Sequence, residues 1–203
     1  SPDRHCSDRV RFIPVFRPVM SAPPDAHWST IEVGGHACET YAPPDAVPGR
    51  ALIYLHDACG RRLEQIPALR RLVESARIPV LGPQAGPSWW LDRVIPAFDA
   101  RVTPERFVVD AVRAEAARRF NAQPPGLALV GVGMGGQGAL RLAYRNPAIF
   151  PVAAAISPAI DFHAAMRHAH ERDDGPSYEP LWEAYGDVER ARQDTRSEEH
   201  TSE

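Results

Sequence analysis

A glycine-rich segment that follows an apolar run is the feature that most constrains the fold of this chain. The run Leu127–Val132 reads LALVGV, and the overlapping segment Gly131–Leu140 reads GVGMGGQGAL. A short apolar run bounded by glycine is typical of a buried strand. Glycine permits the positive φ and the close backbone contact that a tight junction needs. The segment therefore predicts a strand, a sharp turn with positive φ at Gly133, and a helix beginning near Gly135.

Strand-like runs and helical periods alternate along the rest of the chain. The expected strands are Thr30–Val33, Ala37–Tyr41, Ala51–Leu55, Val80–Leu81, Leu127–Val132 and Val152–Ile156. The expected helices have apolar faces at Ile66, Leu69, Val73 and Ala76 and at Val108, Val112, Ala116 and Phe120, with a third helix at Gly135–Asn146. Near-continuous apolar strands between helices are typical of a parallel sheet covered on both faces. We expect an α/β fold with a mostly parallel central sheet.

Composition and charge argue against several classes of protein. The chain has 203 residues, 44% hydrophobic and 24% charged, which is ordinary for one globular domain. A formal net charge of -3 gives no reason to expect a nucleic acid or an anionic membrane as partner. No apolar run approaches the roughly 20 residues of a membrane span. The cysteines Cys6, Cys38 and Cys59 are widely spaced, so we expect reduced thiols, no metal site and a cytoplasmic location.

The two ends of the chain differ from its centre. Residues 1–27 contain prolines and arginines without a clear period, so we expect a poorly ordered lead in which Met20 is an alternative start. Residues 28–195 make up the expected domain. Arg196–Glu203 reads RSEEHTSE, which matches the translation of a sequencing-library adapter, and we interpret this segment as an artefact.

The glycine segment fits two functional patterns. As G-x-G-x-x-G over Gly131, Gly133 and Gly136, it matches a dinucleotide-binding loop, whose glycines let a pyrophosphate approach a helix N-terminus. As G-x-S-x-G with the serine replaced, it matches a nucleophile elbow. A dinucleotide loop normally follows the first strand of its domain, whereas several strands are expected before Gly131. The order of the elements favours the elbow.

The segment Met134–Leu140 (MGGQGAL) resembles the residues after the serine in esterases of the esterase D and S-formylglutathione hydrolase type. Ile53–Gly60 (IYLHDACG) resembles the strand and loop that supply the second oxyanion donor in these proteins, and Gly86–Arg93 (GPSWWLDR) resembles their substrate-side loop. The resemblance covers roughly residues 36–170. It implies an α/β-hydrolase fold and hydrolysis of a small-molecule ester or thioester through an acyl-serine, without metal or cofactor.

The resemblance also implies roles for individual residues. Gly133 stands at the position of the nucleophilic serine. The N–H groups of Met134 and of Ala58 or Asp57 are implied as donors to the developing oxyanion. The implied substrate cleft is formed by His56, Trp89 and Trp90.

The chain departs from the esterase pattern in its catalytic groups. Gly133 has no side chain to attack a carbonyl, whether it is natural or a one-base change of the serine codon AGC to GGC. The triad order on this fold is serine, acid, histidine, and we expect the strands that carry the acid and the histidine to be missing after Thr195. His163, His168 and His170 are expected to be solvated. We therefore expect a truncated hydrolase without serine-esterase turnover; a non-catalytic ligand-binding homologue and a nucleotide-binding protein are the alternatives.

Two further expectations arise from this interpretation. Cys59 lies near the expected oxyanion loop and is the other candidate nucleophile, but no base is identifiable beside it, so we interpret it as a structural thiol. Without further strands, Val152–Ile156 should form an apolar edge of the sheet, to which other chains can pair.

Overall fold

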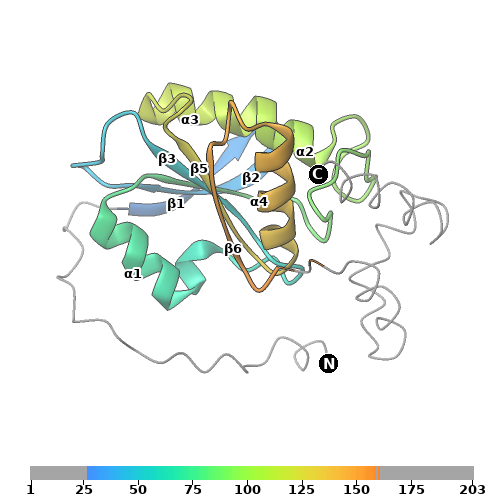
Figure 1. The fold of residues 1–203 in the computed structure, drawn as a ribbon, viewed down its shortest axis with the longest axis horizontal. Helices are drawn as coiled ribbons and strands as arrows, with labels where there is room; N and C mark the ends of the chain where they lie inside the picture. Colours follow the sequence, from blue (N-terminus) through green and yellow to red (C-terminus); the bar gives the residue numbers. More distant parts are fainter. Residues whose placement is uncertain (1–26, 159, 161–203) are drawn as a thin grey trace.

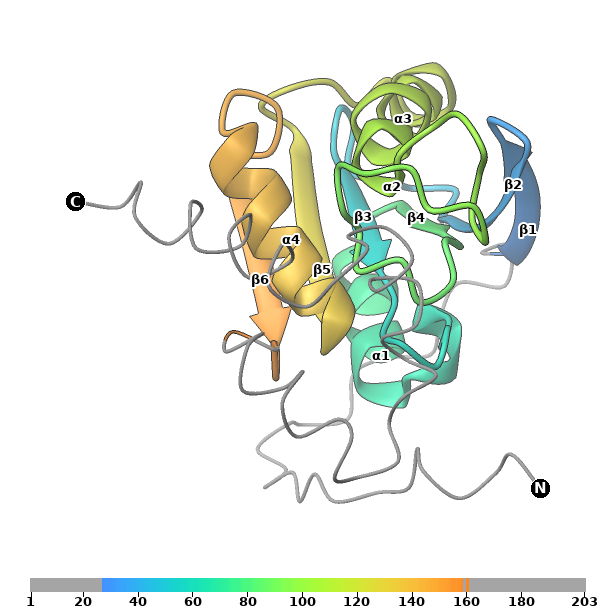
Figure 2. The same ribbon diagram turned by 90° about the vertical axis from the view of Figure 1, so that its right-hand side faces the viewer.

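The computed structural model describes residues 27–158 and 160, which are coloured in Figures 1 and 2. Their strands form one sheet in the order β1-β2-β4-β3-β5-β6. The strands are β1 (His27–Val33), β2 (His36–Ala42), β3 (Ala51–Leu55), β4 (Val80–Pro83), β5 (Leu127–Val132) and β6 (Val152–Ile156). Strand β2 is antiparallel to β1 and to β4, and the remaining neighbours are parallel. The predicted mostly parallel sheet is confirmed.

The two unusual ends of the chain fall largely outside this description. The expected lead contributes only His27, which begins β1. The segment Arg196–Glu203 and the histidines at positions 163, 168 and 170 lie outside the described residues.

The helices follow the predicted apolar periods. They are the 3-10 turn η1 (Leu63–Gln65), α1 (Pro67–Ala76), α2 (Pro104–Arg106), the π-helical η2 (Phe107–Val112), α3 (Arg113–Phe120) and α4 (Met134–Arg145). Elements α2, η2 and α3 follow one another without a break. Thr103 caps this stretch, because its side chain accepts a hydrogen bond from the N–H of Arg106. The π-helical turn was not predicted, because one locally wider turn leaves the apolar period over the whole helix nearly unchanged.

The helices cover both faces of the sheet, with α1 below it and α3 above it in Figure 1. Successive side chains of a strand point to opposite faces, and β3 shows the result. Ile53 belongs to a buried cluster with Phe107 of η2 and Leu142 of α4, whereas Tyr54 belongs to a second cluster with Val73 of α1. The expectation of a parallel sheet covered on both faces is therefore confirmed.

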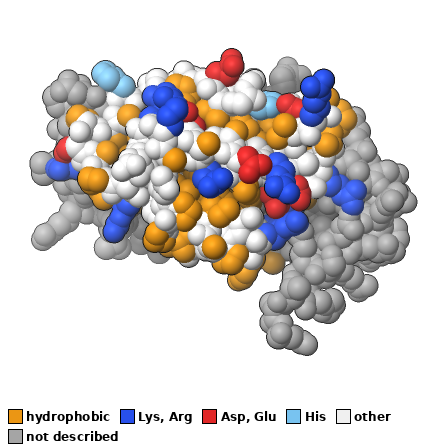
Figure 3. Space-filling model, turned by 90° about the horizontal axis from the view of Figure 1, so that it is seen from above, with side chains coloured by type: hydrophobic (Ala, Val, Ile, Leu, Met, Phe, Trp, Pro, Cys, Tyr) orange, Lys and Arg blue, Asp and Glu red, His pale blue; other side chains and the backbone are white. Residues whose placement is uncertain are grey.

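The surface above α3 carries charges of both signs, with hydrophobic side chains between them (Figure 3). Along α3, Arg118 pairs with Glu115 at 2.6 Å and Arg119 pairs with Glu115 at 3.0 Å. Such exposed pairs contribute little to stability. Among the described helices, none is both long and apolar enough to cross a membrane.

Strand β6 is an edge of the sheet, because among the described strands it pairs with β5 alone. It reads VAAAI, and Val152 is 59% exposed. The opposite edge, β1, carries polar side chains at Ser29, Thr30 and Glu32. Charged or polar side chains on an edge discourage pairing with other chains, and β6 has none.

We predict that Val152→Lys reduces self-association of the protein. A lysine on β6 would have to be desolvated for a second strand to pair there. Size-exclusion chromatography with light scattering measures the effect, and Ser29→Lys on the polar edge is the matched control. If the unsubstituted chain is already a monodisperse monomer with a sharp thermal transition, the exposed edge does not recruit other chains and the prediction fails.

Candidate active site

Gly133 forms the predicted sharp turn between β5 and α4. Its backbone has φ 56° and ψ -116°. The Gly133 N–H donates to the carbonyl of Ile156 at 2.9 Å, and the Gly133 carbonyl accepts from the N–H of Gln137 at 3.1 Å. The helix begins at Met134, one residue before the predicted start. β5 is the fifth strand in chain order and lies between β3 and β6. This position argues against the nucleotide-binding alternative, in which the turn normally follows the first strand of the domain.

Gly133 differs from its neighbouring glycines in its surroundings. A Cβ on Gly131 would overlap the carbonyl oxygen of Gly135, and a Cβ on Gly135 would overlap that of Leu55. Beyond its chain neighbours, a Cβ on Gly133 would meet, among residues 27–158 and 160, only the Cβ of Asp57, at 3.7 Å, which is an ordinary van der Waals distance. Within the described part of the chain, the space at position 133 therefore admits a side chain, and the positive φ disfavours one.

The loop after β3 lies against this turn and is ordered by Asp57. One carboxylate oxygen of Asp57 accepts from the N–H groups of Cys59 and Arg61, at 3.1 and 3.2 Å. The other forms an ion pair with the Arg61 guanidinium at 2.6 Å. The N–H groups of Ala58 and Met134 have no acceptor among the described residues, and that of Met134 begins a helix, where no intrahelical acceptor exists. The predicted donor segments are thus adjacent; their role in an oxyanion hole stays a prediction.

Glu39 of β2 anchors the far end of the same loop and was not predicted. Its carboxylate is buried and accepts from the N–H groups of Leu63 at 2.9 Å and Glu64 at 3.1 Å. Burial raises the pKa of Glu39, and the two N–H donors partly oppose this. The signal in the sequence was a carboxylate within a strand otherwise expected to be buried, ACETY, which requires a partner.

His56 is a structural residue of the loop in this arrangement. Its ring is fully buried, with Nε2 accepting from the N–H of Ala85 at 3.0 Å and Nδ1 donating to the carbonyl of Asp57 at 2.7 Å. These partners fix the neutral tautomer, and burial lowers the pKa of His56. Neither ring nitrogen is free to take a proton from a nucleophile.

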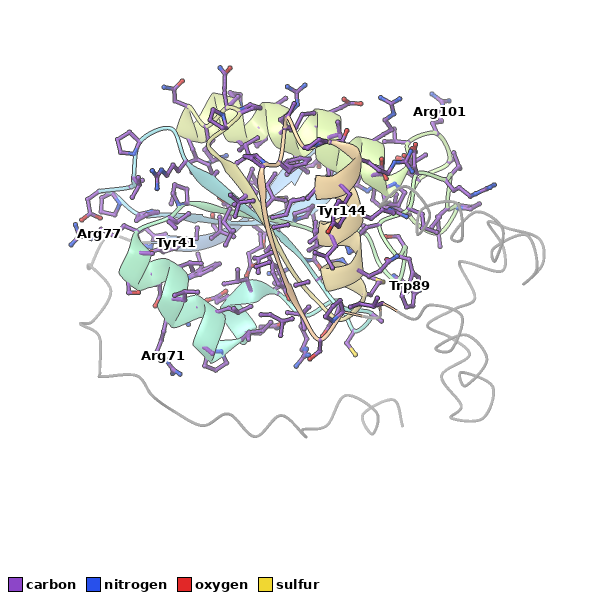
Figure 4. All side chains as sticks on the ribbon, viewed as in Figure 1. Tyr41, Arg71, Arg77, Trp89, Arg101 and Tyr144 are labelled. Carbon is purple, nitrogen blue, oxygen red and sulfur yellow. The ribbon has the colours of Figure 1, made fainter. Side chains whose placement is uncertain are left out.

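Trp89 and Trp90 form a turn with left-handed backbone beside the start of α4, where Figure 4 labels Trp89. Their φ angles are 55° and 56°, a conformation that costs about 1–3 kcal/mol for each non-glycine residue. The Trp89 N–H donates to Met134 Sδ at 3.3 Å, and Trp90 Nε1 donates to the His56 carbonyl at 3.3 Å. Both side chains are buried, so their contacts are with the protein. The substrate-cleft role predicted for His56, Trp89 and Trp90 stays a prediction.

The cysteines do not all match the expectation of reduced thiols. Cys59 is disulfide-bonded in the structure, so the expectation is wrong for this residue. A sulfur in a disulfide is not a thiolate nucleophile, which removes the argument for Cys59 as the catalytic group. Cys38 is a free cysteine, and burial raises the pKa of its thiol to about 12. Among the described residues, no cluster of histidine, cysteine and carboxylate side chains is arranged to hold a metal ion.

Comparison with known proteins identifies the family of this chain. The sequence profile of the family described as "Putative esterase" matches residues 48–202. No curated protein sequence matches the chain.

Several solved structures share the fold. The fluorophosphonate-binding serine hydrolase F of Staphylococcus aureus is 14% identical with a TM-score of 0.54, over 66% of this chain and 58% of that one. MPT51 of Mycobacterium tuberculosis is 22% identical with a TM-score of 0.51, over 66% and 51%. EstE5 is 19% identical with a TM-score of 0.52, over 83% and 58%. The chain thus spans just over half the length of these structures, and the likeness establishes the α/β-hydrolase fold.

Substitutions of the glycines test the geometry of the turn. Gly133→Ala should lower the free energy of unfolding by about 1–3 kcal/mol, because it adds only backbone strain. Gly135→Ala should cost more than about 4 kcal/mol, because the added Cβ overlaps the backbone of β3 and must displace α4. Denaturant unfolding measures both. Equal losses from the two substitutions would contradict the open position at Gly133.

Glu39→Gln should remove a pH dependence of stability. The pKa of Glu39 is raised above its ordinary value of 4.5, so the folded state binds this proton more tightly than the unfolded state. The resulting stabilisation is fully present below pH 4.5 and is lost as the pH rises through the folded-state pKa. The stability of the unsubstituted protein relative to the variant should therefore fall over this range.

Urea unfolding at a series of pH values measures this difference. Glu32→Gln, at an exposed carboxylate on β1, is the control and should show no such change. If stability changed with pH in parallel for the unsubstituted protein and Glu39→Gln, the raised pKa of Glu39 would be contradicted.

Proposed function

Because this chain belongs to the esterase family described as "Putative esterase", we propose that the Gly133 turn is an esterase-type nucleophile elbow with glycine in place of the serine. The observation that carries the proposal is the backbone of Gly133, a positive-φ junction between a central strand and a helix with room for a side chain. A nucleophile elbow is such a strand–turn–helix, with its residue exposed above the sheet.

The chemistry that remains is stabilisation of negative charge. We propose that the N–H groups of Met134, which follows Gly133 in the chain, and of Ala58, which follows Asp57, are the donors of an oxyanion hole, which would bind the developing charge of a tetrahedral intermediate. The Asp57 carboxylate beside them is balanced by Arg61. The substrates proposed by family membership are small-molecule esters of carboxylic acids, or thioesters.

Turnover through an acyl-serine is not supported by this set of residues. Removing the serine of subtilisin costs about 2 × 10⁶ in kcat and leaves roughly 10³–10⁴ over the uncatalysed reaction, from the oxyanion hole and binding. Both ring nitrogens of His56, the histidine nearest to Gly133 in the described part of the site, are already hydrogen-bonded. The proposed state is an esterase site that binds and polarises a carbonyl without forming an acyl-enzyme.

A non-catalytic, ligand-binding role is the second candidate. It is favoured by the open space at Gly133 and by the N–H donors of Ala58 and Met134, which have no acceptor among the described residues. A carbonyl or carboxylate oxygen of an acyl ligand is the kind of group that accepts from such donors.

We predict that the protein shows no burst and no covalent acyl adduct with p-nitrophenyl acetate or butyrate, and no labelling by a fluorophosphonate. Gly133→Ser should not restore turnover, because a serine and its histidine act as a unit. Stopped-flow absorbance and intact-protein mass spectrometry provide the measurements, and Gly133→Ala is the control for backbone strain. An acyl adduct on the unsubstituted chain would refute the proposal, whereas rapid turnover by Gly133→Ser would support the elbow but reveal a base other than His56.

A further inference from the structure

A buried ion pair lies beneath the Trp89–Trp90 turn and takes no part in the chemistry proposed above. Arg141 of α4 and Glu105 of α2 face each other at 3.4 Å, and each side chain is only 7% exposed. The Arg141 guanidinium also donates to the carbonyl of Trp90. On its other side, Glu105 pairs with Arg145 at 3.3 Å. The carbonyl of a strained turn is thus held by a buried charge.

The same turn contacts both segments that carry the proposed oxyanion donors. The Trp89 N–H donates to the side chain of Met134, and the Trp90 indole donates to the carbonyl of His56, two residues before Ala58. The Trp90 side chain also fills the space beside α4, where a Cβ on Gly138 would approach it to 2.7 Å. Displacement of the turn would therefore disturb both donor segments together.

Stability alone does not require this pair to be charged. Replacing a buried ion pair with well-packed apolar side chains is often neutral or stabilising, whereas removing one partner leaves a costly unpaired charge. A left-handed turn at two bulky residues persists only where its surroundings hold it. Arg141 supplies a directed hydrogen bond to the turn, which an apolar side chain of the same size does not.

We infer that Arg141, held by Glu105, is a positioning residue that fixes the Trp89–Trp90 turn and, through it, the N–H donors on both sides of Gly133. This inference rests on the proposed function for the role of the donors, but the clamp itself (Arg141, Glu105 and the Trp90 carbonyl) rests on contacts alone.

The test compares the full chain with Arg141→Met/Glu105→Met, which removes both buried charges, and with Arg118→Met, an exposed arginine of α3 paired with Glu115. Hydrogen exchange followed by mass spectrometry measures how well the backbone amides of the Trp89–Trp90 turn are protected. We expect exchange of the peptide around Trp89 and Trp90 to become about tenfold faster in the double variant, while β3 and β5 keep their protection. If the Arg141–Glu105 pair had only a general packing role, exchange in the double variant would become faster in the turn and in the sheet together.

A second readout reports on the donors. Gly133→Cys places a thiol at the open position in both backgrounds, and mass spectrometry follows its alkylation by iodoacetamide as a function of pH. Nearby N–H donors and a helix N-terminus lower a thiol pKa from its ordinary value of about 8.5. The pH at which the alkylation rate is half-maximal should lie below about 8.5 in the intact chain. This midpoint should rise by about half a pH unit or more when the clamp is removed.

The outcomes distinguish failure of the Arg141 clamp from failure of the proposed oxyanion site. Faster exchange at the turn with a raised midpoint supports the clamp. Unchanged exchange at the turn, or equal loosening of β3 and β5, overturns it. A midpoint that is not lowered in the intact Gly133→Cys chain counts against the proposed oxyanion site, and the exchange data then decide the clamp by themselves.

Discussion

The close backbone contact between the start of α4 and the end of β3 is the constraint on which the rest of the site depends. Gly135 lies so near the carbonyl of Leu55 that no side chain fits between them, and Gly131 lies equally close to the carbonyl of Gly135. This contact sets how α4 leaves the sheet and brings its first N–H groups beside the loop after β3. The turn at Gly133 takes up the change of direction through its positive φ.

Around that contact, several segments are held by buried polar groups as well as by apolar packing. Glu39 fixes the end of the loop after β3, His56 ties the start of this loop to Ala85, and Arg141 donates to the tryptophan turn. A buried polar group is costly without a partner and directional with one. These bonds therefore define the position of each segment more narrowly than hydrophobic contact does. The double left-handed turn at Trp89 and Trp90 is the strained feature that such directional bonds retain.

The proposed function reflects both the groups that this scaffold keeps and the one that it lacks. The family is the one described as "Putative esterase" and the fold is the α/β-hydrolase fold, and the segments that carry the proposed oxyanion donors are adjacent to the turn. The proposed nucleophile position is open as far as the described residues reach, but it holds glycine. Glycine relieves the strain that a serine would bear there, at the expense of the acyl-enzyme route. Function of this kind is assigned from the residues of a site, since one fold supports many activities.

By itself, the sequence determined the strands, the helices and the glycine turn. Strand β3 over Ala51–Leu55 and β5 over Leu127–Val132 have the bounds predicted, and α4 begins one residue from its predicted start. These features depend on apolar periodicity and on the φ range of glycine, which are local properties of the chain. Only the tertiary structure decided which polar side chains are buried together. Glu39 meets a partner 24 residues away and Arg141 meets one 51 residues away, and no local pattern encodes such pairs. The same holds for His56: the resemblance implied a place in a substrate cleft, which stays a prediction, whereas the hydrogen-bond partners of both ring nitrogens were decided by the fold.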